Sequence, residues 1–537
     1  MDNEDIELES DKRSVSGNIN IDTDIDLSGS NFFSVRQGQD SLNFAAPKAK
    51  FDLKKKVITC QKVDFVGVGD ARIYPDSNKV LIRRKAEMDP LKNAMIVCNY
   101  VTKYHKITEV TAKISGRKEY KASGKYAYID ENKMEQKIYF ANISLDTTFQ
   151  TYAKGDVKPE ERFMLSPHFE YKGGVELKAN DKGLNFNGAT RLMHNCPSIN
   201  RDWVVFKGVV DPMDIRIPIG NPIINFDGGG FLGSGITLSQ DSLVIYPSFL
   251  SGKIKKEHID VMAAEGYLIF DKRLQEYQIA KDEKLKENTL PGNLVAFAKE
   301  KCEIRGDGKM NFGVNTGQFK VTPIGNITQK LGSGNPVMKV ALMCDFPFSD
   351  DAMKKMADKI INYPDIQQFD YEKSNYEKAL RELIGMEKAD KVIADLSLHG
   401  EVKRFPDELE KSIVFADVTL KWIPEEGIWL SEGKLAISNI NNKQIFKYVD
   451  GRVMIQKGRS FDQVSIVIKL DDSNWYFFTY AKELMEVTSS DSNFNKIVQE
   501  TKDDKRKYKG EKGQQDFEYR FNNNRRGRAQ ELLDRAN

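Results

Sequence analysis

Short runs of alternating apolar and polar residues recur along most of the chain, with turn-forming residues between them. Examples are AKFDLKKKVITCQKVDFV (49–66), DARIYPDSNKVLI (70–82), GKYAYIDENKMEQKIYF (124–140), GGVELKANDKGLNFNG (173–188), EGYLIFDKRLQEYQIA (265–280) and EGKLAISNINNKQIFKYV (432–449). A period of two places every second side chain on the same face of a strand. Asp, Asn, Lys and Gly at the joints favour turns. The pattern predicts antiparallel hairpins or rungs of a β-solenoid, with irregular spacing between units.

Two segments carry a helical period instead. Ser349 is suited to cap a helix over SDDAMKKMADKIINY, and Pro364 follows its end. One apolar face of this helix includes Met353, Met356 and Ile360. A second helical run covers about 371–396. Together they predict a helical hairpin inserted between β regions, and the apolar face is a candidate docking site for a partner protein.

These patterns predict an all-β fold of repeated antiparallel hairpins, arranged as a trough, a solenoid or stacked sandwiches, with the helical hairpin as an insertion. The predicted regions are a mobile acidic lead-in with a short strand near 19–27 (1–44), a β-repeat body (45–345), the helical insertion (346–396), a second β body (397–490) and a polar, basic, solvated tail (491–537).

Charge and hydropathy narrow the class of protein. Lys plus Arg is 81 and Asp plus Glu is 79, so the formal net charge is +2. This balance weakens a whole-chain case for nucleic acid or an acidic membrane surface. No uncharged apolar run reaches the length of about 18 residues that a transmembrane helix requires. The sequence MDNEDIELESDKRS is acidic and has no apolar region behind it, which is the reverse of a signal peptide. We therefore expect either a cytoplasmic protein or an internal segment of a longer exported chain.

The five cysteines are far apart and form no CxxC pair: Cys60, Cys98, Cys196, Cys302 and Cys344. Such spacing fits neither a zinc site nor a dense disulfide framework. Buried, unreactive thiols are the expectation.

Two motifs suggest ligand chemistry but favour structural roles. DGGGFLGSG matches GxGxxG at Gly228, Gly230 and Gly233, yet the residues after it alternate like a strand. A dinucleotide site needs a helix at that point, so a glycine-rich turn between strands is favoured. His194 and Cys196 are two residues apart, which in a strand would place both on one face; without further ligands nearby, a packed histidine is the favoured interpretation. His105, His168, His258 and His399 form no metal-binding spacing either.

The carboxylates and the basic C-terminal stretch also favour structural roles. Asp211, Asp214, Asp471 and Asp472 are expected to cap turns rather than to form a catalytic pair. The C-terminal stretch KDDKRKYKGEKGQQDFEYRFNNNRRGR mixes aromatic and basic residues, but its acidic residues dilute the positive charge, so nucleic acid is not an expected partner. The sequence predicts no catalytic residue, no metal and no cofactor.

Two resemblances carry functional expectations. APKAKFDLKKKVITCQKVDFV, GDARIYPDSNKVLIRRKAEM and YKASGKYAYIDENKMEQKIYF resemble OstA/LptA-type lipopolysaccharide-transport repeats over 45–190. Proteins with that repeat stack antiparallel strands into an open trough that passes lipid across the periplasm. Segments such as SLVIYPSFLSG and WYFFTYAKELMEVTSSDSNFNKIV look like the C-terminal part of large uncharacterised β-rich proteins of Bacteroidota, over most of 45–510. This second resemblance implies a fragment of a longer polypeptide and supplies no activity.

Three functions follow as hypotheses. The leading one is a non-enzymatic structural or envelope-associated protein that handles lipid or outer-membrane components, located in the periplasm or outer membrane if the chain is part of an exported protein. The alternative is a carbohydrate-binding or carbohydrate-active β-solenoid. The third is a scaffold that docks other envelope proteins through 349–396. A lipid trough predicts a continuous apolar lining of Ile, Val, Leu and Phe, whereas a sugar site predicts exposed aromatic residues beside clustered charges.

Overall fold

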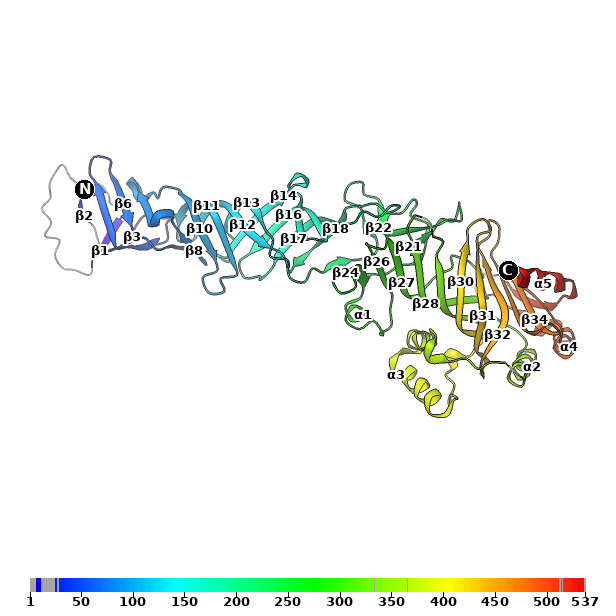
Figure 1. Cartoon of the computed structure of the whole chain (residues 1–537). Helices are drawn as coiled ribbons and strands as arrows, with labels where there is room; N and C mark the ends of the chain where they lie inside the picture. The colour runs from blue at the N-terminus through cyan, green and yellow to red at the C-terminus, as the bar shows by residue number, and fades with distance from the viewer. Residues whose placement is uncertain are drawn as a thin grey trace. The chain divides into compact units, whose positions relative to one another are not determined.

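A computed structural model describes residues 6–10, 25–26, 29–332, 334–364, 366–510, 513 and 515–535. The fold is dominated by antiparallel sheets (Figure 1), which confirms the predicted all-β class. The chain forms two compact units. Unit 1 comprises residues 1–193 and 203–218, and unit 2 comprises residues 194–202 and 219–537.

Two small antiparallel sheets come first in unit 1. One contains β1 (Ile6–Ser10), β3 (Ser30–Ser34) and β4 (Asn43–Ala46), and the other contains β2 (Ile25–Asp26), β5 (Lys48–Asp52), β6 (Val57–Gln61) and β9 (Lys79–Ile82). Of the strand expected near 19–27, β2 is the described part; residues 11–24 and 27–28 lie outside the described residues.

The large sheet of unit 1 pairs strands largely in chain order. Its strands are β7 (Val66–Val68), β8 (Ala71–Tyr74), β10 (Leu91–Cys98), β11 (His105–Gly116), β12 (Glu119–Ile129), β13 (Glu135–Leu145), β14 (Thr151–Val157), β15 (Phe163–Ser166), β16 (Phe169–Lys178), β17 (Leu184–Leu192) and β18 (Val204–Val210). β15 pairs with β16 beside the main path, and every pairing shown is antiparallel.

Alternation along these strands produces one filled face. In β11, Ile107, Ala112 and Ile114 are buried, whereas Lys106 and Lys113 are exposed. The pairings from β10 to β14 each contain a register shift. Such bulges bend strands and increase their twist, so the sheet can curl around its own apolar face. Tyr120 and Phe140 fill that face with 1% and 0% of their surface exposed.

Unit 2 has a second large sheet, which also follows chain order through most of its length. Its order is β24 (Gly266–Asp271), β25 (Glu276–Ala280), β26 (Leu294–Ala298), β27 (Glu303–Lys309), β28 (Lys320–Lys330), β29 (Val337–Asp345), β30 (Lys411–Ile423), β31 (Ile428–Asn441), β32 (Lys443–Gln456), β33 (Gln463–Asp471), β34 (Asn474–Ala481), β35 (Leu484–Ser489), β37 (Phe517–Phe521) and β36 (Lys507–Tyr508). A smaller sheet contains β20 (Ile223–Ile224), β21 (Phe231–Leu238), β22 (Ile245–Gly252) and β23 (Ile259–Met262). β19 (Ile217–Ile219) crosses the sequence boundary between the units.

The two expected helices are confirmed as α2 (Asp350–Ile361) and α3 (Tyr376–His399). Ser349 caps α2 as predicted, because its Oγ accepts a hydrogen bond from Ala352 N at 3.4 Å. The helices lie apart along the sheet rather than side by side (Figure 1). They interrupt one continuous sheet, since β29 before them and β30 after them are paired neighbours. The shorter helix α1 (Asp282–Lys286) follows β25.

The C-terminal segment is folded against the sheet, so the interpretation as a solvated tail is wrong. β37 pairs with β35 in parallel, and the helices α4 (Ser492–Glu500) and α5 (Arg526–Asp534) flank it in sequence. The buried carboxylate of Glu486 accepts hydrogen bonds from Arg520 Nη2 at 2.6 Å, Asn522 Nδ2 at 2.8 Å and Arg525 Nε at 2.6 Å. Apolar residues hidden among the charges are also buried: Phe494, Val498, Phe517, Tyr519, Ala529 and Leu532.

The cysteines depart in part from the expectation of buried thiols. Cys60, Cys98 and Cys344 are free and buried, as predicted, and burial raises the pKa of Cys60 to about 12. Cys196 and Cys302 instead form a disulfide within unit 2, although they are 106 residues apart in sequence. Sequence spacing misses this bond because only the folded sheet brings residues 194–202 against the turn between β26 and β27.

We expect reduction of this disulfide to lower the free energy of unfolding by about 2–4 kcal/mol, because the bond closes a long loop in the unfolded chain. Denaturant unfolding with and without dithiothreitol measures the change. The variant Cys196→Ala/Cys302→Ala is the control and should not respond to reductant. Five free thiols in the untreated protein, found by mass spectrometry, would contradict the assignment.

Candidate functional site

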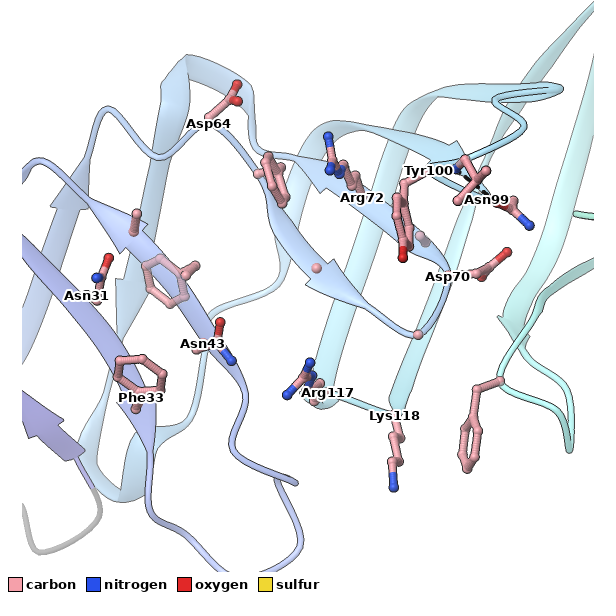
Figure 2. A pocket seen from close by; sticks show the side chains of 18 of the residues that line it. Asn31, Phe33, Asn43, Asp64, Asp70, Arg72, Asn99, Tyr100, Arg117 and Lys118 are labelled. Atoms are coloured by element: carbon pink, nitrogen blue, oxygen red, sulfur yellow. Dashed lines mark hydrogen bonds between the residues drawn. The ribbon is translucent and has the colours of Figure 1, made fainter.

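A cavity of about 1060 Å³ lies in unit 1, where several strand ends and turns meet (Figure 2). Its walls come from β3, β4, the residues before β7, the β7–β8 hairpin and three further turns of the large sheet. The lining includes Asn31, Phe33, Asn43, Lys62, Asp64, Phe65, Gly67, Asp70, Arg72, Asn99, Tyr100, Val101, Arg117, Lys118, Phe149 and Gln150. These side chains are mostly polar, charged or aromatic.

The β7–β8 hairpin organises the floor of this cavity. Its two-residue turn is Gly69–Asp70, and Gly69 has φ +58°, a conformation that favours glycine at the first position of such a turn. A Cβ on Gly69 would lie 2.6 Å from Leu145 Cδ1. Gly67 has open space where its side chain would be, and it faces Arg72 in the register of the two strands. The hairpin therefore leaves room above Arg72.

Asp70 ties this turn to two neighbouring segments. Its Oδ1 accepts hydrogen bonds from Thr151 N at 2.8 Å and from Thr151 Oγ1 at 2.7 Å, and its main-chain oxygen accepts one from Tyr100 N at 2.9 Å. Oδ2 is buried and has no hydrogen-bond donor among the described residues. Burial raises the pKa of this carboxyl, and the hydrogen bonds from Thr151 oppose the rise. Asp70 thus connects the β7–β8 turn to the segments that contain Tyr100 and Thr151.

The other turns are ordered by their own hydrogen bonds. Asn99 Oδ1 accepts from Val101 N at 3.0 Å, and Asp146 Oδ1 accepts from Thr148 N at 2.8 Å and Gln150 N at 3.0 Å. Gly69 N donates to Arg117 O at 2.8 Å. Carboxylate and amide side chains that bond to following N–H groups are a standard way to fix a turn. The cavity walls are therefore shaped by the fold before any ligand arrives.

Four cations line the cavity: Lys62, Arg72, Arg117 and Lys118. In the part of the chain that the structure describes, none of them forms an ion pair. The guanidinium of Arg72 lies 4.4 Å from the ring centre of Phe65 and 5.2 Å from that of Tyr100. Contact with aromatic rings orients a cation without neutralising it. The carboxylates in the lining are Asp64 and the buried Asp70, so positive charge predominates in the cavity.

Exposed apolar side chains stand beside these cations. Tyr100 is 47% exposed, Val101 72% and Phe149 45%. We call these three residues the apolar rim, because all of them line the cavity. Lys118 Nζ lies 5.2 Å from the Phe149 ring centre. Figure 2 shows Tyr100, Arg117 and Lys118 around the same opening.

The predicted docking residues occupy a different place and are buried. Met353, Met356 and Ile360 are 1%, 0% and 0% exposed, and their helix packs with α4 and the β31–β32 part of the sheet. Their apolar face is already covered by the chain itself. A partner could reach them only if α2 left the sheet.

The glycine motif forms the turn that the sequence predicts. Residues 225–230 connect β20 to β21, which are paired antiparallel strands. Gly229 adopts φ +63°, and Gly229 N donates to Asn225 O at 3.0 Å. Strand, turn and strand replace the strand, loop and helix that a dinucleotide requires.

His194 and Cys196 lie in a segment without regular structure, so the expectation of a strand is wrong there. Cys196 N donates to His194 Nδ1 at 3.3 Å, and the imidazole packs edge-on to Phe297. Burial, followed by the charges of Arg201 and Lys299, lowers the pKa of His194 to about 4. His194 is therefore a packed histidine, as the favoured interpretation had it.

The buried His194 gives a pH prediction. Its pKa in the folded protein lies below the ordinary value of 6.5, so the unfolded chain binds the proton first and stability falls as the pH drops from about 6.5 to about 4. The loss should reach about 3 kcal/mol. His194→Asn keeps an acceptor for Cys196 N but does not titrate, and urea unfolding across this range should show a smaller pH dependence. Identical slopes for the two proteins would contradict the assignment.

Carboxylates that the sequence assigns to turns have that role. Asp211 Oδ1 accepts from Met213 N at 2.9 Å, and Asp471 Oδ1 accepts from Ser473 N at 2.7 Å. Asp214 pairs with Arg216, and Asp472 pairs with Lys469. Each is engaged with residues close to it in the sequence.

No family model matches the chain, and no curated protein matches its sequence significantly. Within the described residues, no helix is long and apolar enough to cross a membrane. The same residues contain no group of three or more His, Cys, Asp or Glu side chains placed to hold a metal ion.

Sequence reasoning missed the cavity residues. Their signal is present in two turns of the sequence: NYVTKY (99–104) combines aromatic and aliphatic residues with one lysine, and GRKE (116–119) contains two adjacent cations. Each turn alone looks like an ordinary solvated loop. The folded sheet brings together turns that are about 15 to 80 residues apart in sequence, and this step has no local sequence signature.

The two glycines of the hairpin give a matched stability test. Gly69→Ala should destabilise the protein by about 1–3 kcal/mol, because the residue has φ +58° and its Cβ would meet Leu145. Gly67→Ala meets no atom within 4 Å and should change stability by less than about 0.5 kcal/mol. Denaturant unfolding compares the two, and equal effects would contradict the described turn.

Proposed function

We propose that this protein is a non-enzymatic, envelope-associated binding protein whose cavity in unit 1 holds an anionic saccharide. The ligand class is a sugar chain that carries phosphate or carboxylate groups, either free or as the head of a glycolipid. Arg72, Arg117 and Lys118 would bind the anionic groups, and Tyr100 would pack against the sugar ring.

The unpaired cations are the observation that carries this proposal. On a protein surface, cationic side chains usually have carboxylates nearby. This chain has almost equal numbers of the two kinds of group, 81 Lys plus Arg and 79 Asp plus Glu. Four cations that form no ion pair with the described residues line one cavity and produce a local positive potential that attracts anions. The planar guanidinium groups are suited to bidentate contacts with phosphate or carboxylate.

The aromatic residues favour a saccharide over a simple anion. A sugar site is expected to have exposed aromatic rings beside charged groups, whereas a lipid trough is expected to have a continuous apolar lining. The cavity has the first kind of lining. The curled sheet of unit 1 fills its apolar face with its own side chains, such as Tyr120 and Phe140. That packing favours binding at the polar cavity over passage of acyl chains along the inner face.

An envelope location has independent support in the disulfide. Disulfides persist in oxidising compartments such as the periplasm and are rare in the cytoplasm. The Cys196–Cys302 bond therefore supports an exported protein. The resemblance to OstA/LptA-type repeats points to the same compartment.

Titration calorimetry with soluble saccharides tests the proposal. The probes are the delipidated, phosphorylated core oligosaccharide of a lipopolysaccharide, an oligomer of uronic acid, and neutral dextran of similar length. At least one anionic probe should bind more tightly than dextran and lose affinity as salt is added. Arg72→Gln should weaken it about tenfold, which corresponds to about 1.4 kcal/mol.

Two further variants distinguish binding at the cavity from nonspecific electrostatic binding elsewhere on the protein. Gly67→Leu adds a side chain in open space above Arg72 and should block binding while the protein stays folded. Lys121→Gln removes an exposed cation of β12 outside the cavity and should have little effect. Equal binding of all three probes, or equal loss in Arg72→Gln and Lys121→Gln, would overturn the proposal.

A further inference from the structure

We infer that the apolar rim docks the cavity on a membrane surface, so that the anionic saccharide is recognised as the headgroup of a membrane-embedded glycolipid. This inference rests on the proposed function and names the source of the ligand. The partner is a lipid surface that presents anionic headgroups.

The rim has a composition that a soluble sugar does not require. Tyr100 and Phe149 can pack on sugar rings, but Val101 offers neither a ring nor a polar group and is 72% exposed. A polar residue at the tip of this turn would be solvated without cost to the fold. An aliphatic side chain there gains contacts only if an apolar phase covers it.

The rim residues are also held in place. Val101 N donates to Asn99 Oδ1 at 3.0 Å, Tyr100 N donates to Asp70 O at 2.9 Å, and Phe149 N donates to Asp146 O at 3.0 Å. Both turns are therefore fixed with their apolar side chains exposed. Fixed turns can enter the interface of a bilayer without first being ordered, which favours binding.

Charge indicates which surface fits. Lys62, Arg117 and Lys118 line the same opening as the rim, and Lys103 is exposed two residues beyond Val101. Basic residues beside exposed aromatic and aliphatic groups match the two layers of an anionic membrane: charged headgroups outside and hydrocarbon beneath. The net charge of the whole chain is only +2, so it does not reveal this local cluster of basic residues.

Vesicle sedimentation with the full chain tests the inference. The vesicles are phosphatidylcholine alone, phosphatidylcholine with phosphatidylglycerol, and phosphatidylcholine with the lipopolysaccharide whose delipidated core is the soluble probe. Binding should be strongest to the last. Val101→Ser should weaken it about fivefold, because part of the buried apolar area is lost. The affinity of the same variant for the soluble core oligosaccharide should stay within about twofold, because Val101 makes no polar contact with the sugar.

A control and a gain-of-function variant complete the design. Met134 is 62% exposed in the turn between β12 and β13 and does not line the cavity, so Met134→Ser should leave vesicle binding unchanged. Val101→Trp should strengthen binding and shift tryptophan emission to shorter wavelength when vesicles are added.

The outcomes separate the two proposals. If the soluble core oligosaccharide binds at Arg72 but the Val101 variants do not change vesicle binding, the membrane inference is overturned and the saccharide site stands. If vesicle binding depends on Val101 but no anionic oligosaccharide binds, the saccharide proposal fails and the rim remains a membrane contact. If neither probe binds, both proposals fail.

Discussion

In the two large sheets most strands pair with the next strand along the chain, and this pairing is the constraint on which the structure depends. Backbone N–H and C=O groups inside a protein must be hydrogen-bonded, and in each large sheet the ladder satisfies them with neighbours that are close in sequence. In unit 1, register shifts let the sheet curl over a face filled by residues such as Ile107 and Phe140. The same rule explains why α2 and α3 can be inserted: β29 and β30 remain paired beside them.

This arrangement leaves recognition to the turns. The strands commit one face to the core, so the groups free to meet a ligand stand at strand ends, where turns from several hairpins lie side by side. Asp70 links three of these segments, because it bonds to Thr151 and Tyr100 and sits in the β7–β8 turn. Arg72, two residues further, lines the same cavity, and its side chain lies beside Tyr100 (Figure 2). The β7–β8 hairpin thus contains both Asp70, which fixes the neighbouring turns, and Arg72, which lines the cavity.

The parts of the structure that depend on local pattern could be predicted from the sequence. Alternation in 124–140 and 173–188 predicts strands that the structure contains, and Ser349 caps α2 as expected. What could not be predicted depends on contacts between distant residues. The Cys196–Cys302 bond, the burial of the C-terminal segment around Glu486, and the gathering of Arg72 with Lys118 each require the folded sheet. Met353 shows both sides of this limit. Its position on an apolar helix face correctly predicts that it is buried, but the sequence does not show that the sheet of the same chain covers it.

Hydrogen–deuterium exchange with and without the phosphorylated core oligosaccharide tests the central claim most directly, because it locates the ligand without assuming a site. The account predicts slower exchange in the turns that line the cavity, around residues 67–72, 99–101, 117–118 and 148–150. Exchange in unit 2 should not change. Protection that falls in unit 2, or along the strands of unit 1 away from these turns, would contradict the assignment of the cavity as the binding site.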